Sequence, residues 1–170
     1  IFNLQWYYDA LDRIKSEILP DGSVINFSYN QQNKLESIPG ILPNIDYNER
    51  NLPTKRFYRN GLESNFTFDQ NNLRLIKIKT GGGIQELDYK YDAVGNVKEI
   101  NNLADSKLKQ MNYDDLNRLI WVNDTDYAVS YTYDSLGNMF NVSFDNLKIN
   151  FNYGTVPAHG PKQVIIVNTS

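Results

Sequence analysis

The chain of 170 residues contains one histidine, His159, and this is the first side chain to consider for acid–base or nucleophilic chemistry. A Ser-His-Asp triad would have to use it, because imidazole is the usual base that activates a serine. The sequence has no Gly-x-Ser-x-Gly elbow to present such a nucleophile. We therefore expect His159 to be a turn residue, and we expect a protein that is not an enzyme and has no catalytic residue.

A set of recurring aspartates could be read as calcium ligands, namely Asp9, Asp92, Asp114 and Asp134. Calcium prefers carboxylate oxygens that cluster around one point. One aspartate in each repeat would instead form a row along the edge of a sheet. The spacing favours turn capping over metal binding, so we expect no metal and no cofactor.

Two tyrosines, Tyr89 and Tyr131, are candidate ligand-facing aromatics. Aromatic rings offer broad faces at little entropic cost, so a row of them could form a stacking platform for a glycan or another apolar partner. The alternative, which we favour, is a packed or cavity-lining face. Binding of a glycan or a cell-surface protein stays open at this point.

The composition limits the elements that can position these residues. A chain of 170 residues without cysteine fits one domain that folds without disulfides. The net charge of -3, with scattered Lys and Arg, argues against nucleic-acid binding, and no apolar run approaches the roughly 20 residues of a membrane span. Twelve Tyr and eight Phe favour half-buried strands, so we expect an all-β protein.

One heptapeptide pattern recurs along almost the whole chain. Clean copies begin at Tyr8, Tyr91, Tyr113 and Tyr133, degenerate copies begin at Tyr29, Tyr47 and Phe68, and an eighth copy begins at Tyr153 and loses the pattern at Gly154. The steps between leading aromatics are 18 to 23 residues by subtraction of their numbers, about 21 on average. Such regular spacing predicts a tandem repeat, so we expect one repeat domain over residues 1–170.

Each position of the heptapeptide has residue types that suit a turn between two strands. The second is Asp or Asn in the complete copies, whose side chain can close an Asx-type turn. The seventh is usually apolar and begins the outgoing strand; Pro53 in the third copy predicts an edge or a bulge. The fifth has types that tolerate a positive φ angle: Asp12, Asn33, Asn51, Asn72, Gly95, Asn117 and Gly137.

A second strand and a second turn complete each repeat. A large apolar or aromatic residue lies two positions before each leading aromatic, for example Trp6 before Tyr8, and this period of two predicts the buried face of a strand. Turn signals fall midway between the motifs at residues 21–22, 39–40, 60–61, 81–83, 101–102, 123–124 and 145–146. We therefore expect an antiparallel β-hairpin array of roughly 14 to 16 strands, forming a curved or coiled sheet.

The Tyr-Asp-x-x-Gly-Asn/Arg-Leu pattern resembles the Rhs/YD-repeat family, which occurs in bacterial polymorphic toxins, Tc toxin complexes and animal teneurins. Tyr91, Asp92 and Gly95 match its motif, as do Tyr113, Asp114, Asn117, Tyr133, Asp134 and Gly137. Residues 159–164 resemble the Gly-Pro-His-x-Val stretch of bacterial members, although here the histidine precedes the glycine.

The resemblance implies a β-shell that encloses or displays a toxin or effector, in a secreted or cell-surface protein. The effector or further YD repeats would then lie outside this segment. The family's autocleavage motif contains an Asp-Pro pair, which this sequence lacks, so we expect no self-processing. The alternative is a binding module that uses its tyrosine-rich strands.

Overall fold

The computed structural model describes residues 3–154 and 160–168, and these form strands and turns without a helix. The expectation of an all-β, antiparallel hairpin array is confirmed. The chain divides into two compact units, Ile1–Glu86 and Leu87–Ser170. Each unit is described by itself, and a single YD-repeat domain over residues 1–170 stays a prediction.

The first unit contains the strands β1 to β9, all of them short. They are β1 (Gln5–Tyr8), β2 (Ile14–Ile18), β3 (Val24–Asn26), β4 (Ser28–Tyr29), β5 (Leu35–Ser37), β6 (Asn44–Tyr47), β7 (Pro53–Phe57), β8 (Glu63–Phe68) and β9 (Leu75–Thr80).

Strand β10 (Gln85–Tyr91) crosses the boundary between the units, and the second unit contains the remaining strands. They are β11 (Val97–Asn102), β12 (Lys107–Tyr113), β13 (Leu119–Asn123), β14 (Ala128–Tyr133), β15 (Met139–Phe144), β16 (Leu147–Tyr153) and β17 (Pro161–Asn168).

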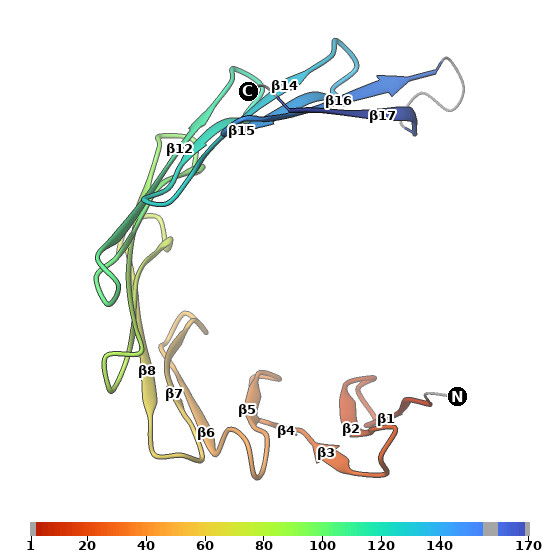
Figure 1. Ribbon diagram of the computed structural model, residues 1–170. Coiled ribbons are helices and arrows are strands. Elements are labelled where there is room, and N and C mark those ends of the chain that lie inside the picture. The colour runs from red at the N-terminus through yellow and green to blue at the C-terminus, as the bar shows by residue number, and fades with distance from the viewer. Residues whose placement is uncertain (1–2, 155–159, 169–170) are drawn as a thin grey trace. The chain divides into compact units, whose positions relative to one another are not determined.

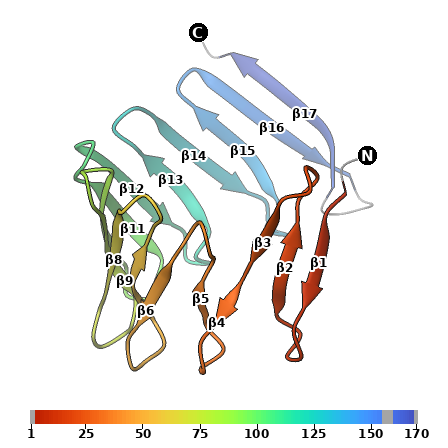
Figure 2. The same ribbon diagram turned by 90° about the horizontal axis from the view of Figure 1, so that it is seen from below.

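Strands that are consecutive in the chain lie next to one another in each unit (Figure 1). Strands β1 to β3 form one small sheet, β4 and β5 pair with each other, and β6 to β17 follow one another in chain order in a larger sheet. Figure 2 shows the alternating directions that this hairpin order produces. The described residues contain seventeen strands, slightly more than expected, because Phe27 interrupts one predicted strand and divides it into β3 and β4.

A β-bulge marks the entry to every motif. The register shifts by one residue between the leading aromatic and the residue before it, so that Tyr113, for example, lies opposite Leu119. The bulge predicted from Pro53 is present opposite Tyr47. The same shift occurs at Tyr8, Tyr29, Phe68, Tyr91, Tyr133 and Tyr153. The bulge is therefore a feature of the repeat and does not require proline.

The fifth motif position has a positive φ in six of the seven complete copies, as expected, for example 113° at Gly95 and 86° at Gly137. The prediction for Asn72 was wrong, because the left-handed residue there is Leu73. The Leu73 N–H bonds to the carbonyl of Asp69, four residues back, so this turn contains one extra residue. A turn with an added residue moves the left-handed position along the chain by one.

The second set of turns is mostly where the sequence places it. Gly22, Gly40, Gly61 and Gly82 have positive φ, between 73° and 85°. The prediction at residues 101–102 was wrong: Asn101 and Asn102 end β11, and the turn follows at 103–106. The turn predicted at residues 123–124 also lies further along, closed by the Asp124 N–H donating to the carbonyl of Tyr127.

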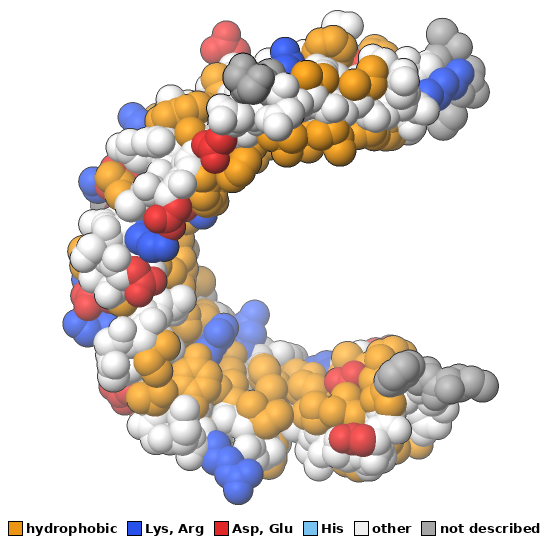
Figure 3. Space-filling view, in the orientation of Figure 1, with side chains coloured by type: hydrophobic (Ala, Val, Ile, Leu, Met, Phe, Trp, Pro, Cys, Tyr) orange, Lys and Arg blue, Asp and Glu red, His pale blue; other side chains and the backbone are white. Residues whose placement is uncertain are grey.

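Few side chains are fully enclosed in this fold. Leu42, Ile45, Val122 and Val129 are the buried hydrophobic residues of the described chain. From Phe27 onwards, the aromatic residues of the expected buried face are half-buried, and hydrophobic side chains gather along one side of the strands of the second unit (Figure 3). The first repeat does not follow this pattern, because Trp6 is 47% exposed and Tyr8 is 57% exposed. Both lie on β1, which is the outermost strand of its sheet.

Candidate functional site

The motif turns gather the polar side chains that the sequence singles out. In each clean copy one carboxylate oxygen of the aspartate accepts backbone hydrogen bonds from residues two and four positions later. The Asp114 Oδ1 atom accepts from Leu116 at 3.0 Å and Arg118 at 2.9 Å. The equivalent bonds are made by Asp9, Asp92 and Asp134. These are the bonds of an Asx-type turn.

The second carboxylate oxygen binds the sixth motif residue, an interaction that our sequence interpretation missed. Arg118 Nε donates to Asp114 Oδ2 at 2.7 Å, and Arg13 does the same to Asp9. In the other two clean copies the donor is the amide of Asn96 or Asn138, at 2.9 Å from Asp92 or Asp134. The recurrence of Arg or Asn at the sixth position of the clean copies could have predicted this bond, because both side chains can donate to a carboxylate.

These hydrogen bonds stabilise the ionised carboxylates. The side-chain bond from Arg13 lowers the pKa of Asp9, and the side-chain bond from Asn138 lowers the pKa of Asp134. For Asp114 the largest cause of the lowered pKa is the backbone N–H of Arg118. Burial opposes the change at Asp92, but the bonds from Asn96 and Gly95 still leave its pKa lowered. These four carboxylates are therefore anions at neutral pH.

A second set of bonds joins five of the repeats to the repeat before them. The hydroxyl of the leading tyrosine donates to the backbone carbonyl of the seventh residue of the preceding motif, as Tyr113 does to Val97 at 2.8 Å. The same bond runs from Tyr29 to Ile14, Tyr47 to Leu35, Tyr133 to Leu119 and Tyr153 to Met139, at 2.6 to 2.8 Å. Burial raises the pKa of Tyr47, Tyr113 and Tyr133. These three tyrosines are thus neutral hydrogen-bond donors between repeats.

The sixth motif residue also reaches the next repeat. The guanidinium of Arg13 lies 4.3 Å from the ring centroid of Tyr29, and that of Arg118 lies 4.6 Å from Tyr133. Arg13 donates to Asn33 at 2.7 Å and Asn96 donates to Asn117 at 2.9 Å, both acceptors being fifth motif residues. The motif residues are therefore engaged in turn closure and in contacts between repeats.

Within residues 3–154 and 160–168, no group of three or more acidic or histidine side chains is placed to hold a metal ion. The aspartates of successive motifs lie one to a turn, each in its own Asx-type turn. His159 lies outside the described residues. The described part of the chain also contains no helix that could cross a membrane.

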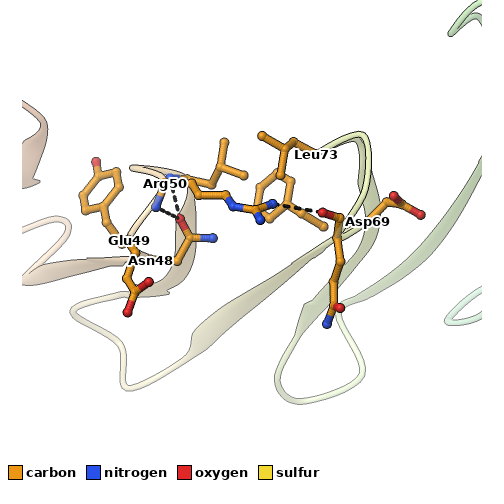
Figure 4. A pocket seen from close by; sticks show the side chains of 9 residues that line it. Asn48, Glu49, Arg50, Asp69 and Leu73 are labelled. Atoms are coloured by element: carbon orange, nitrogen blue, oxygen red, sulfur yellow. Dashed lines mark hydrogen bonds between the residues drawn. The ribbon is translucent and has the colours of Figure 1, made fainter.

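One groove of the first unit lies between the third and fourth motif turns and has a volume of about 520 Å³ (Figure 4). Arg50 extends across it and donates from Nη1 to the backbone carbonyl of Gln70 at 2.9 Å. Asn48 accepts the backbone N–H groups of Arg50 and Leu52 on the other side. Asn48 therefore closes the third motif turn, and Arg50 joins that turn to the fourth.

The two candidate ligand-facing tyrosines lie within strands, away from the motif turns. Tyr89 on β10 is paired with Ile100, and Tyr131 on β14 is paired with Val142. Both rings are half-buried, and burial raises the pKa of Tyr89. Apolar cross-strand partners suit a packed face. Contact of either ring with a ligand stays a prediction.

Comparison with solved structures gives a fold match over almost the entire chain. The crystal structure of TcdB2-TccC3-Cdc42 matches with a TM-score of 0.72 and 18% identity, covering 97% of this chain and 10% of that chain. The Tc holotoxin pore of Photorhabdus luminescens matches with a TM-score of 0.70, at 18% identity and the same coverages. TcdB2-TccC3 alone gives a TM-score of 0.71 at 18% identity.

No protein-family model matches the sequence, and no curated protein matches it either. The chain spans about a tenth of the length of the solved chains that it matches. At this level of identity the match establishes the fold, which is that of a region within the Tc toxin chains.

Proposed function

We propose that this chain is a non-catalytic YD-repeat scaffold, part of the wall of a β-shell that encloses or displays a toxin or effector. The observation that supports it best is the fold match to TcdB2-TccC3 over 97% of the chain. The motif residues support the same role, because their polar atoms close turns and join successive repeats.

This role has consequences for partners and location. The partner would be an effector domain or further YD repeats, and the working protein would be secreted or displayed at the cell surface of a bacterium. The fold match to toxin complexes supports this placement. The wall would act through its geometry, by separating the effector from its surroundings.

Protease protection tests the proposal. The complete gene that encodes residues 1–170 is expressed, and the product is treated with trypsin under native conditions. A shell predicts that an adjoining effector domain resists cleavage and becomes sensitive when the wall is opened with denaturant. An adjoining domain that is cleaved at once in the native protein, or a complete gene that encodes no other domain or repeat, would contradict the shell.

A glycan-binding module is the alternative, supported by the half-buried rings of Tyr89 and Tyr131 on β10 and β14. Screening on a saccharide array, with Tyr89→Ala and Tyr131→Ala as variants, separates the two functions. Binding that both substitutions abolish without loss of folding would favour the module. Binding to no saccharide would favour the shell.

A further inference from the structure

Arg56, on β7 of the first unit, is a cation without a counter-ion. No carboxylate lies within ion-pair distance of it among residues 3–154 and 160–168, and its Nε atom is buried without a hydrogen-bond partner. A buried donor without a hydrogen-bond partner is costly on a charged group, because it has lost its hydrogen bond to water. The ring of Phe66 lies beside Arg56, with its centroid 4.9 Å from the guanidinium carbon, and the charge of Arg56 also acts on Tyr47.

The register of the sheet places Arg56 on a face that is otherwise uncharged around it. Ile45, Arg56, Ser64 and Thr80 are paired in one row across β6 to β9. Side chains of directly paired residues lie on the same face of a sheet. Ile45 is only 7% exposed and Ser64 only 2%, so this row is among the best enclosed parts of the described chain.

The opposite face of the same strands supplies its cations with carboxylates. Lys55, the residue before Arg56, pairs with Glu63 at 3.2 Å. Lys77 and Lys79 on β9 both contact Glu86, at 2.9 and 3.0 Å. The first unit therefore provides counter-ions for three lysines on the opposite face of these strands, whereas Arg56 has none among the described residues.

Hydroxyl groups beside Arg56 are bonded to one another. Ser64 Oγ lies 2.7 Å from Thr80 Oγ1 and 3.2 Å from the hydroxyl of Tyr58. Either atom of these pairs can be the donor, so the hydroxyls can rotate toward an added acceptor. They therefore offer neutral hydrogen-bond donors to an anion without adding a second charge.

We propose that Arg56 is a binding site for a single carboxylate group. The planar guanidinium presents paired donors that match the two oxygens of a carboxylate. One cation in an uncharged row suits a singly charged ligand, whereas a doubly charged phosphate is better matched by more than one cation. The carboxylate can come from a small organic acid or from an acidic side chain of a polypeptide that lies on this face.

NMR titration of the ¹⁵N-labelled protein tests the site through the Arg56 side-chain Nε–Hε signal. Sodium acetate is the first probe, against sodium chloride at the same ionic strength. A capped Leu-Glu-Leu peptide is the second, against capped Leu-Gln-Leu. We expect a saturable shift with acetate that chloride does not produce. If the source is a polypeptide, Leu-Glu-Leu binds about tenfold more tightly than Leu-Gln-Leu, which is about 1.4 kcal/mol.

Variants separate the site from general charge effects. Arg56→Met should abolish the shift that acetate produces at neighbouring signals such as Phe66 and Ile78. Arg59→Met, which removes an exposed arginine of the same unit, should leave it intact. If Arg56→Met does not fold, Arg56→Lys keeps the charge, loses the planar donors, and should bind acetate about tenfold more weakly.

An acetate shift no larger than that of chloride, or one that survives Arg56→Met, would overturn the site. Saturation by acetate without preference for Leu-Glu-Leu would support it and assign small organic acids as its ligands. Carboxylate binding at Arg56 is independent of the shell role, so a negative titration would leave the outcome of the protease test unaffected.

Discussion

At the scale of single residues, different atoms of the same motif side chain make different contacts. One oxygen of Asp114 closes a turn and the other fixes Arg118, whose guanidinium lies over Tyr133 of the next repeat. The hydroxyl of Tyr133 in turn bonds to the carbonyl of Leu119. The chemistry that aspartate and tyrosine could offer is used in joining one repeat to the next.

Removal of one tyrosine hydroxyl should lower the stability of the fold by a measurable amount. In Tyr133→Phe the Leu119 carbonyl loses the donor that lies at 2.8 Å. We expect a loss of about 1 kcal/mol in the free energy of unfolding, the ordinary net value of a protein hydrogen bond. Urea denaturation measures it. Tyr7→Phe is the control, because Tyr7 is 52% exposed and its hydroxyl is 3.5 Å from its nearest recorded acceptor; equal losses would refute the role of the bond.

Backbone conformation at the fifth position gives a second prediction. Gly137 has φ of 86°, and an added Cβ atom would meet nothing closer than Arg118 Nη1 at 4.0 Å. Gly137→Ala therefore tests strain without a clash, and we expect a loss of roughly 1 to 2 kcal/mol. Gly81→Ala is the matched control, since Gly81 lies in a turn without a positive φ and has ordinary contacts. Thermal melts in which the two variants behave alike would exclude the conformational explanation.

At the scale of elements, much of the hairpin array was predictable. Aspartate, asparagine and glycine at fixed spacing determine where a chain can turn, and these are local properties. The bulge at each leading aromatic was missed outside the third repeat, because register depends on the partner strand. The strand ending at Asn102 was missed for a related reason: the asparagine pair resembles a turn, yet pairing with Leu108 and Lys107 keeps it in the sheet.

The candidate site was predictable in part. The turn-closing role of the second motif residue follows from its type and position, whereas the bonds between repeats depend on which repeats are neighbours. Arg56 gave no sequence signal. Its missing counter-ion becomes visible only when the two faces of β7 are distinguished.

The motif turns should make stability sensitive to acid. The pKa values of Asp9, Asp92, Asp114 and Asp134 are lowered in the folded chain. Their stabilising contribution is therefore complete above the unfolded value of about 3.9 and is lost as pH falls through the folded values. We expect the melting temperature to fall steeply below about pH 4. Asp114→Asn, which mimics the asparagine of the second and third motifs, should flatten this fall, and an unchanged pH profile would contradict the assignment.

At the scale of the whole molecule, each unit is a hairpin array with little enclosed core. The four buried hydrophobic side chains of the described residues are spread over β6, β13, β14 and the turn at Leu42. Stability in such an array comes mainly from contacts between neighbouring repeats. The outermost strands then have the least support.

This dependence on neighbours predicts that strands with one partner are less protected than strands paired on both sides. Strand β1 has a partner on one side only and carries the exposed Trp6, Tyr7 and Tyr8. Strands β13 and β14 are paired on both sides and contain the buried Val122 and Val129. Hydrogen exchange at neutral pH should therefore be fastest in β1 and slowest in β13 and β14, by a factor of at least about 100, since opening a supported repeat breaks several hydrogen bonds of about 1 kcal/mol each. Uniform exchange across these strands would mean that pairing on both sides adds no protection and that stability does not build up from neighbouring repeats.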